Sequence, residues 1–417
     1  MRRPIRRVPG GRISLLALIL AGSAAFLSGC GESTTVTLHE EVPDLGGDAS
    51  LPDGAVTENR PPNPASSLEL PCPFAEVEDR ANNPFLQGVL GPDAIATIDE
   101  PKWVNVRNRQ LVMFESEVVT VVEFEGIIRI FPTRIMLQHE IVNMCWDTAS
   151  GPRYTYLTYC PLVDGYMHFT DDRACTAKNK YGVSGGVFNG NLIMFDRKTL
   201  RDSTVTMFVQ LYAGGLNGSC AETDPMFVTM SWSMARKLYP NAVVLSVDTG
   251  VAPPGGYDLF EHPYTDYWNF SDPRDFGFAI EANDPRFAQM HRIYGLIGAT
   301  ERKAYQIRGA TPYVANDMID GTRVTVFVDP AFSAAAAYEA VHDGQDLTFS
   351  LVGREGKSLP IYRDEETGTL WNFEAIGLEG PLKGARLPRM MGFQVFWFAW
   401  SSLFPTTDTF RPPPSDS

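Results

Sequence analysis

The chain has 417 residues, of which 35 are lysine or arginine and 50 are aspartate or glutamate, so its formal net charge is −15. A chain of this length can form more than one hydrophobic core. Because no basic cluster interrupts the acidic background, the protein repels phosphate backbones, and the composition excludes nucleic acid as a partner.

Residues 1–30 have the features of a secretory leader. They carry five arginines and no acidic residue, and the apolar run that follows is too short to span a membrane. The run ends in LSGC, which resembles the bacterial lipobox. The resemblance implies that Cys30 is lipidated and tethers the mature chain to the cell envelope, and Gly31 favours the outer membrane, facing the periplasm or the cell surface. An ordinary signal peptide with a chance cysteine is the alternative.

Two further segments have too little apolar surface to fold. Residues 31–70 contain glycine and proline pairs among scattered polar residues, and residues 409–417 end in RPPPSDS. We expect a disordered linker and a disordered tail there. Roughly 340 residues lie between them, which is enough for two core-forming units.

This central part contains a weak internal repeat. YGVSGGVFNGNLIMFDRKT, which begins at Tyr181, aligns with FSLVGREGKSLPIYRDEET, which begins at Phe349, and glycine and tryptophan motifs follow both copies in the same order. We therefore predict an internal duplication, with two tandem related sheet-containing units at 95–250 and 285–408.

Each unit is expected to be rich in β structure. Runs of β-branched and aromatic residues predict strands at 118–124, 154–159, 192–195 and 205–212. Helical signals are fewer and lie at 133–144, 232–239 and 332–342. The expected fold class is α+β with a predominance of strands.

Chemically able side chains gather between residues 137 and 165. On a helix through residue 144, His139 and Asn143 share one face, so the imidazole could act as a base or a ligand while the amide orients a partner. A core histidine with satisfied hydrogen bonds and a solvated Glu140 are the plain alternatives.

Aligning the two units separates candidate site residues from scaffold. Asn143 is matched by Asn316, whereas His139, Glu140 and Cys160 are matched by Pro312, Tyr313 and Asp329. Only the first unit keeps the imidazole, the carboxylate and the thiol, and this asymmetry favours a site in that unit. These three residues are the catalytic candidates, and His139 with Cys160 could also bind a divalent metal ion.

Cysteine pairing remains open at this stage. Five cysteines follow Cys30, and an odd number leaves at least one unpaired: Cys72, Cys145, Cys160, Cys175 and Cys220. Cys160 lies at a predicted strand end, where a thiol can be exposed, although burial or a disulfide is commoner in an exported protein. We predict a bond between Cys175 and Cys220 and a free Cys160.

Two more residues complete the candidates for ligand binding, together with Asn143. Ser184 lies in GVSGG, which matches the hydrolase motif G-x-S-x-G, but polar residues precede it and no helix pattern follows, so a glycine-rich turn is favoured. Arg197 could bind a carboxylate. Asp196, which recurs in the second unit as Asp364, favours a turn or capping role.

Several motifs together resemble the family called domain of unknown function 3179. They are IIRIFPTRIMLQHEIVN, LTYCPL, YGVSG, NLIMFDRKT, DEETGTLWNFEAIGLEGPLKGARLP and FWFAW, within residues 103–406. The resemblance implies functional positions at His139, Glu140, Asn143 and Cys160. The chain departs from the family pattern at Met144 and at Val163, where a second cysteine is expected, so a dithiol or a two-thiolate metal site is excluded.

Three functions remain under consideration. The favoured one is a tethered lipoprotein that binds a small ligand or a metal ion near His139, Glu140 and Cys160. The second is a hydrolase or transferase in which Cys160 attacks and His139 relays the proton. The third is a structural envelope protein without such a site.

Overall fold

The structure is a computed structural model that describes residues 60–71, 83–108, 111–176, 180–199, 203–206, 212–214, 220–253, 256–257, 263–353 and 358–412. The leader with Cys30, residues 31–59 of the expected linker, Cys72 and residues 413–417 lie outside the described residues. Within the described ranges, no helix is both long and apolar enough to cross a membrane. The described residues all belong to the unit Pro52–Ser417.

Three sheets contain the strands of the N-terminal half, as we call residues 95–250. The first has the order β13-β3-β4-β14-β2, formed by Phe227–Ser231, Val118–Phe124, Ile127–Pro132, Val243–Leu245 and Trp103–Asn105. The second has the order β12-β7-β6-β5, formed by Glu222–Thr223, Gly165–Asp171, Gly151–Cys160 and Ile141–Thr148. The third has the order β1-β8-β9-β10-β11, formed by Leu86–Gly88, Tyr181–Phe188, Asn191–Asp196, Ser203–Thr206 and Tyr212–Gly214.

The C-terminal half, residues 285–408, contributes most of the strands in four further sheets. The first has the order β26-β15-β16-β27, formed by Gly392–Phe396, Arg292–Ile297, Arg302–Gln306 and Asp408–Phe410. The second is β17-β18-β19, formed by Tyr313–Ile319, Thr322–Asp329 and Ala334–Glu339. The others are the pair β20 (Val341–His342) and β21 (Gln345–Asp346), and the sheet β22-β23-β24-β25, formed by Phe349–Gly353, Ile361–Asp364, Leu370–Trp371 and Gly377–Glu379.

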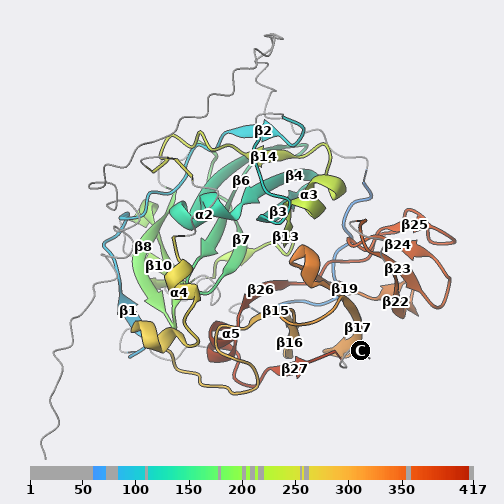
Figure 1. Ribbon diagram of the computed structural model, residues 1–417. Helices are drawn as coiled ribbons and strands as arrows, with labels where there is room; N and C mark the ends of the chain where they lie inside the picture. Colours follow the sequence, from blue (N-terminus) through green and yellow to red (C-terminus); the bar gives the residue numbers. More distant parts are fainter. Residues whose placement is uncertain are drawn as a thin grey trace, which may run out of the picture. The chain divides into compact units, whose positions relative to one another are not determined.

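The helices are short. They are α2 (Thr133–His139), α3 (Trp232–Leu238), α4 (Thr265–Trp268) and α5 (Trp397–Leu403), with 3₁₀ turns η2 (Arg197–Thr199), η3 (Pro273–Phe276) and η4 (Pro330–Phe332). The described protein is therefore β-rich, with several sheets and few helices (Figure 1).

Two of the three predicted helices need correction. The helix expected at 133–144 ends at His139, and β5 begins at Ile141. The helix expected at 332–342 is wrong, because Ala334–Glu339 forms β19 and pairs with β18. All six residues of β19 are buried, so tertiary packing of small side chains overrides the helical preference of alanine. The helix at 232–239 and the strand at 118–124 are confirmed.

The two halves share one hydrophobic core. Val119, Ile130 and Met230 from the N-terminal half belong to the same buried cluster as Phe327 and Trp371 from the C-terminal half. Strand β13 lies beside β19, and β26 lies beside β7 (Figure 1). The N-terminal half is consequently packed against elements that follow it in the chain.

Residues 60–71 lie against this body rather than apart from it. Arg60 forms an ion pair with the buried Glu374, and the backbone N–H of Ser67 donates to Glu339 at 2.8 Å. We expected a linker up to about residue 70. Its described end, from Arg60 onward, makes these contacts.

Candidate functional site

The turn between α2 and β5 buries an acidic side chain. Glu140 ends α2 with φ 57°, in a region that favours glycine or asparagine over glutamate. Its backbone is fully bonded, because its N–H donates to the carbonyl oxygen of Met136 at 2.8 Å and its carbonyl accepts from the N–H of Tyr159 at 2.7 Å. The side chain is 7% exposed. The fold therefore holds Glu140 in an unfavourable conformation that buries its carboxyl group.

The Glu140 carboxyl group makes no hydrogen bond with any residue that the structure describes. Burial raises its pKa to about 8, because a buried carboxylate loses its hydration without gaining a counterion. At neutral pH the group is mostly protonated and can donate a hydrogen bond.

Cys160 ends β6, and its thiol is free and 2% exposed. The thiol donates to the carbonyl oxygen of Gly190 at 3.6 Å. Burial, together with the smaller effect of the Glu140 charge, raises the pKa of Cys160 to about 12. The predicted free cysteine is confirmed, and it is a neutral thiol at physiological pH.

Tyr264, which directly precedes α4, belongs to the same neighbourhood. Burial raises its pKa, and the charges of Glu140 and Cys160 act in the same direction. A carboxyl group, a thiol and a phenol therefore interact electrostatically. We call Glu140, Cys160 and Tyr264 the acid cluster.

The turn that follows Cys160 is held by groups from later in the chain. The Tyr267 hydroxyl donates to the carbonyl oxygen of Leu162, and the Trp268 indole donates to that of Pro161, both at 2.9 Å. The N–H of Phe396, in β26, donates to the carbonyl oxygen of Val163 at 2.9 Å. We call residues 161–164 the thiol loop; three of its carbonyl oxygens accept hydrogen bonds from these later residues.

His139 uses both ring nitrogens on other partners. Nδ1 lies 2.6 Å from the carbonyl oxygen of Ala96, and Nε2 lies 2.6 Å from the Tyr257 hydroxyl. Since a carbonyl can only accept, Nδ1 carries the proton and Nε2 accepts from Tyr257. Burial lowers the pKa of His139, so the ring is neutral. These bonds describe a positioned core histidine, which is the plainer of the two expectations.

A metal centre does not emerge among the residues described. They include no group of three or more His, Cys, Asp or Glu side chains that could hold a metal ion.

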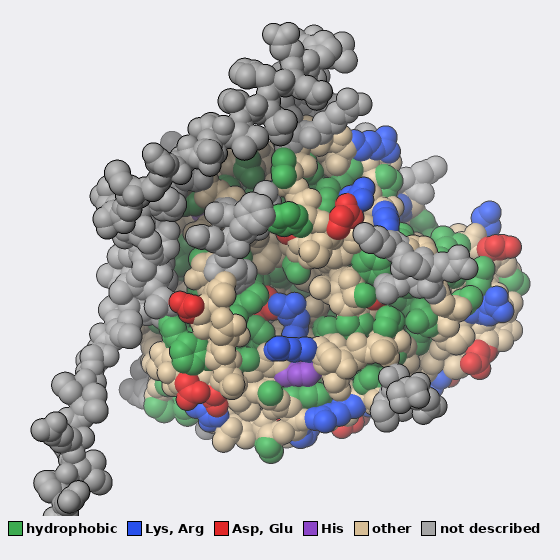
Figure 2. Space-filling view, in the orientation of Figure 1, with side chains coloured by type: hydrophobic (Ala, Val, Ile, Leu, Met, Phe, Trp, Pro, Cys, Tyr) green, Lys and Arg blue, Asp and Glu red, His purple; other side chains and the backbone are tan. Residues whose placement is uncertain are grey.

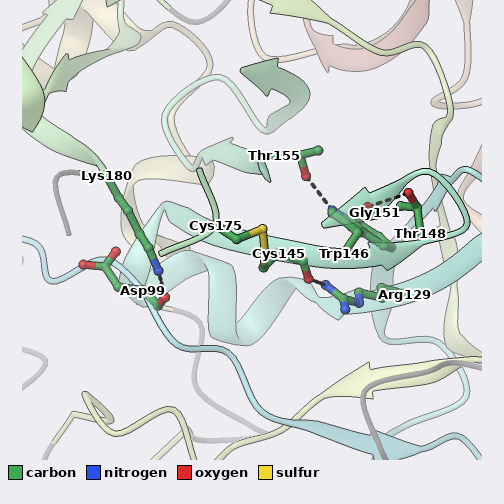
Figure 3. The surroundings of a disulfide bond; sticks show 9 residues. All are labelled: Asp99, Arg129, Cys145, Trp146, Thr148, Gly151, Thr155, Cys175 and Lys180. Atoms are coloured by element: carbon green, nitrogen blue, oxygen red, sulfur yellow. Dashed lines mark hydrogen bonds between the residues drawn. A yellow bond between two sulfur atoms is a disulfide. The ribbon is translucent and has the colours of Figure 1, made fainter. Parts of the chain in front are cut away.

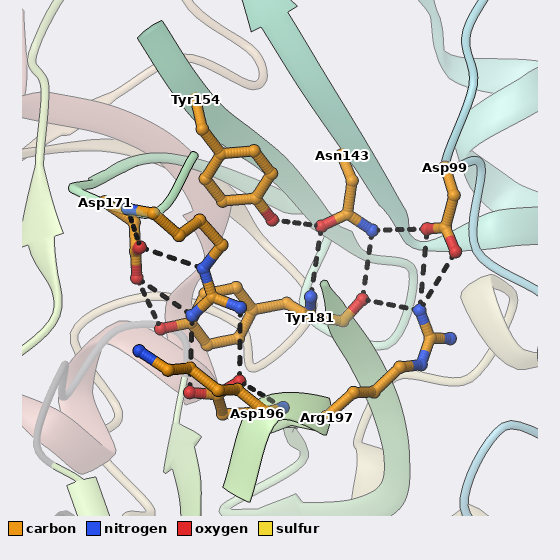
Figure 4. Close-up of polar contacts among 9 residues, drawn as sticks. Asp99, Asn143, Tyr154, Asp171, Tyr181, Asp196 and Arg197 are labelled. Carbon is orange, nitrogen blue, oxygen red and sulfur yellow. Dashed lines mark hydrogen bonds and ion pairs between the residues drawn. The ribbon is translucent and has the colours of Figure 1, made fainter. Parts of the chain in front are cut away.

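Asn143 lies on strand β5, so the expected helical face shared with His139 does not exist. Its amide donates to Asp99 at 2.6 Å and to the carbonyl oxygen of Tyr181 at 3.0 Å. Its oxygen accepts from the Tyr154 hydroxyl at 2.5 Å and from the N–H of Tyr181 at 3.2 Å (Figure 4). With both amide hydrogens and its oxygen engaged, Asn143 ties β5 to β8.

Arg197 and Ser184 are also engaged internally. Arg197 forms ion pairs with Asp93 at 2.7 Å and with Asp99 at 3.1 Å, the latter visible in Figure 4. The Ser184 hydroxyl donates to the carbonyl oxygen of Ile193 at 2.5 Å and accepts from the N–H of Gly186 at 3.0 Å, at a register shift between β8 and β9. Ser184 thus stabilises an irregular stretch of strand β8, whereas the sequence favoured a glycine-rich turn at this position.

The predicted disulfide between Cys175 and Cys220 is wrong. Cys175 is bonded to Cys145 on β5, with the two Cα atoms 5.5 Å apart (Figure 3). Cys220 is also disulfide-bonded. In the loop that carries Cys175, Arg173 pairs with Asp171 at the end of β7 and with Asp196 at the end of β9. Spacing in the chain does not reveal that Cys175 lies next to Cys145.

A family comparison covers the whole of this site. The family model described as "Protein of unknown function (DUF3179)" matches residues 92–407. The chain belongs to this family. No curated protein and no solved structure matches the chain.

In this DUF3179 chain, sequence reasoning named two of the three members of the acid cluster. Tyr264, and Tyr257 beside His139, lie in an irregular stretch after residue 250 for which no element was predicted. No periodicity or motif there could have identified them. Val163, at the position of the expected second cysteine, is fully buried and serves the thiol loop through its backbone.

Proposed function

We propose that this DUF3179 protein binds a small uncharged molecule at the acid cluster. The observation that carries the proposal is the Glu140 carboxyl group, which is buried, without a hydrogen bond to any described residue, and held at a positive φ. Backbone strain of this kind costs about 1–3 kcal/mol, and burial of a carboxyl group adds the cost of removing it from water. Costs of this kind concentrate at functional sites.

The chemistry of the cluster favours an uncharged ligand. At neutral pH the carboxyl group, with a pKa of about 8, and the thiol, with a pKa of about 12, both carry their protons. They can offer hydrogen-bond donors to an acceptor on the ligand. A charged ligand would instead require one of these buried groups to ionise.

The other two functions receive less support. A cysteine nucleophile needs a lowered thiol pKa and an adjacent base, whereas burial raises the pKa of Cys160 and His139 bonds elsewhere. A purely structural role does not account for a buried carboxyl group held at a positive φ.

We also propose that Cys30 anchors the chain to the bacterial envelope, favouring the outer membrane. The support is the basic, apolar and LSGC succession of residues 1–30. Cys30→Ala should move the protein from the membrane fraction to the soluble fraction, and unchanged fractionation would contradict the anchor.

The internal duplication is likewise proposed. Its support is the matching strand orders β13-β3-β4-β14 and β26-β15-β16-β27, in each of which the last strand pairs in parallel. Superposition of the two halves in an experimental structure tests it, and different strand directions would refute it.

Ligand binding can be tested with a library of uncharged fragments and the full chain in detergent. Some fragments should raise the melting temperature of the wild-type protein but not that of Glu140→Ala, because the mutation removes the donor. Arg236→Met is the matched control, since Arg236 forms an exposed ion pair with Glu115. If no fragment stabilises the wild type, or if Glu140→Ala responds equally, the proposal fails.

A further inference from the structure

We infer that Arg292, in the C-terminal half, is a positioning residue for the Cys160 thiol and acts through Asp164. The inference rests on the proposed function in that it treats the thiol loop as a wall of the ligand site. Its test measures thiol reactivity, so it can succeed or fail independently of any ligand.

Asp164 is the last residue of the thiol loop and lies four residues after Cys160. It has φ 52° and is 8% exposed. One carboxylate oxygen accepts from the Tyr159 hydroxyl at 2.9 Å, and the other forms an ion pair with Arg292. Tyr159 directly precedes Cys160, so Asp164 links the residue before the thiol to the Arg292 guanidinium.

Burial raises the pKa of Asp164, and the charge of Arg292 opposes that rise. A buried carboxylate that loses its only ion-pair partner is left with an uncompensated charge. The loop would have to move, or Asp164 would have to take up a proton, if Arg292 were removed.

Arg292 is placed by the same sheet that holds Val163 of the thiol loop. It begins β15 and pairs in register with Phe396 of β26, whose N–H holds the carbonyl of Val163. The Arg292 guanidinium also lies 5.9 Å from the centre of the Trp268 ring, whose indole holds Pro161. Contacts to Pro161, Val163 and Asp164 therefore converge on one region of the molecule.

These contacts give the C-terminal half a role in a site whose candidate chemical groups come from earlier in the chain. The thiol donates to the carbonyl oxygen of Gly190 at 3.6 Å, and Cys160 pairs with Gly165 across the turn that the thiol loop forms between β6 and β7. Release of the loop increases the population of open states in which a buried thiol meets solvent.

The test is the rate at which N-ethylmaleimide labels Cys160 in the folded full chain, followed by peptide mass spectrometry. We expect Arg292→Met to raise this rate about tenfold, since local opening controls access to a buried group. Arg292→Lys, which keeps the charge but not the forked geometry, should give a smaller rise. Arg236→Met should leave the rate unchanged.

A melting curve recorded with each variant separates positioning from general stability. If Arg292→Met lowers the melting temperature but labels at the wild-type rate well below it, Arg292 is merely structural and the inference is overturned. Should Arg292→Met fail to fold, Arg292→Lys decides: a wild-type labelling rate in that variant overturns the inference, and a raised rate supports it.

Discussion

We call the two hydrogen bonds that an asparagine side chain makes with the backbone N–H and carbonyl of one distant residue an asparagine clasp. Both halves contain such a clasp, in different chemical surroundings. Asn143 donates to the carbonyl of Tyr181 and accepts from its N–H, and Asn316 makes the same two bonds with Phe349, both at 2.8 Å. Each clasp ties a strand of one sheet to the first strand of the next hairpin. Because this feature is present in both halves, it favours a scaffold role for Asn143.

The halves differ where the acid cluster lies. The residue aligned with Cys160 is Asp329, and its carboxylate caps η4 by accepting from the N–H of Ala331 at 3.1 Å. Helix α2, which brings Glu140 into the interior, separates β4 from β5, whereas no helix separates β16 from β17. The comparison teaches that the candidate chemical groups depend on two features that the C-terminal half lacks, namely the thiol at Cys160 and the helix α2 before Glu140.

The largest expected effect on stability comes from replacing Glu140 with a side chain that cannot ionise. Its folded-state pKa of about 8 lies above the usual value of 4.5, so the folded state retains a proton that the unfolded state releases, and stability falls as pH rises from about 5 to about 8. This loss amounts to about 3–4 kcal/mol. Glu140→Gln should remove this pH-dependent loss, so the variant should lose less unfolding free energy than the wild type between pH 5 and pH 8. Urea unfolding at both pH values measures this difference, and parallel pH profiles would contradict it.

The next largest effect on the free energy of unfolding is expected when the clasps are removed one at a time by mutation. Asn143→Ala removes the two hydrogen bonds with the Tyr181 backbone and those with the Tyr154 hydroxyl and Asp99, so we expect a loss of about 3 kcal/mol. Asn316→Ala removes only the two bonds to Phe349 and should cost about 2 kcal/mol. Chemical denaturation compares the two variants. A larger loss for Asn316→Ala would reverse our ranking of the two networks.

The smallest effect separates the two aligned positions, Cys160 and Asp329. Asp329→Ala removes a cap and should cost about 1 kcal/mol while leaving fragment-induced stabilisation intact. Cys160→Ala should cost a similar amount and reduce that stabilisation. Thermal melting with and without a fragment distinguishes them, and equal fragment responses would show that the thiol is not part of the site.

Sequence reasoning located much of the scaffold because scaffold features are local. The β-branched run at Val118–Phe124 is a strand in the structure. The recurring aspartates also behave as expected of turn residues, since Asp196 accepts from the N–H of Lys198 and Asp364 from that of Thr367. Patterns of this kind depend on near neighbours and are visible in the chain.

The site was less accessible to such reasoning because its properties depend on distant contacts. His139 bonds to Ala96 and to Tyr257, which are 43 and 118 residues away. A solvated carboxylate was the plain expectation for Glu140, yet the turn after α2 buries it. The alanines of β19 were expected to be helical for the same reason, since nothing in the local sequence reports that both faces are covered.

The amino-acid sequence by itself determined the acidity of the chain, its β-rich character and its membership of the DUF3179 family. Only the tertiary structure decided which groups are neutral and which are paired. The charge state of a side chain depends on the water it loses and the partners it gains, and both are set by segments far apart in the chain.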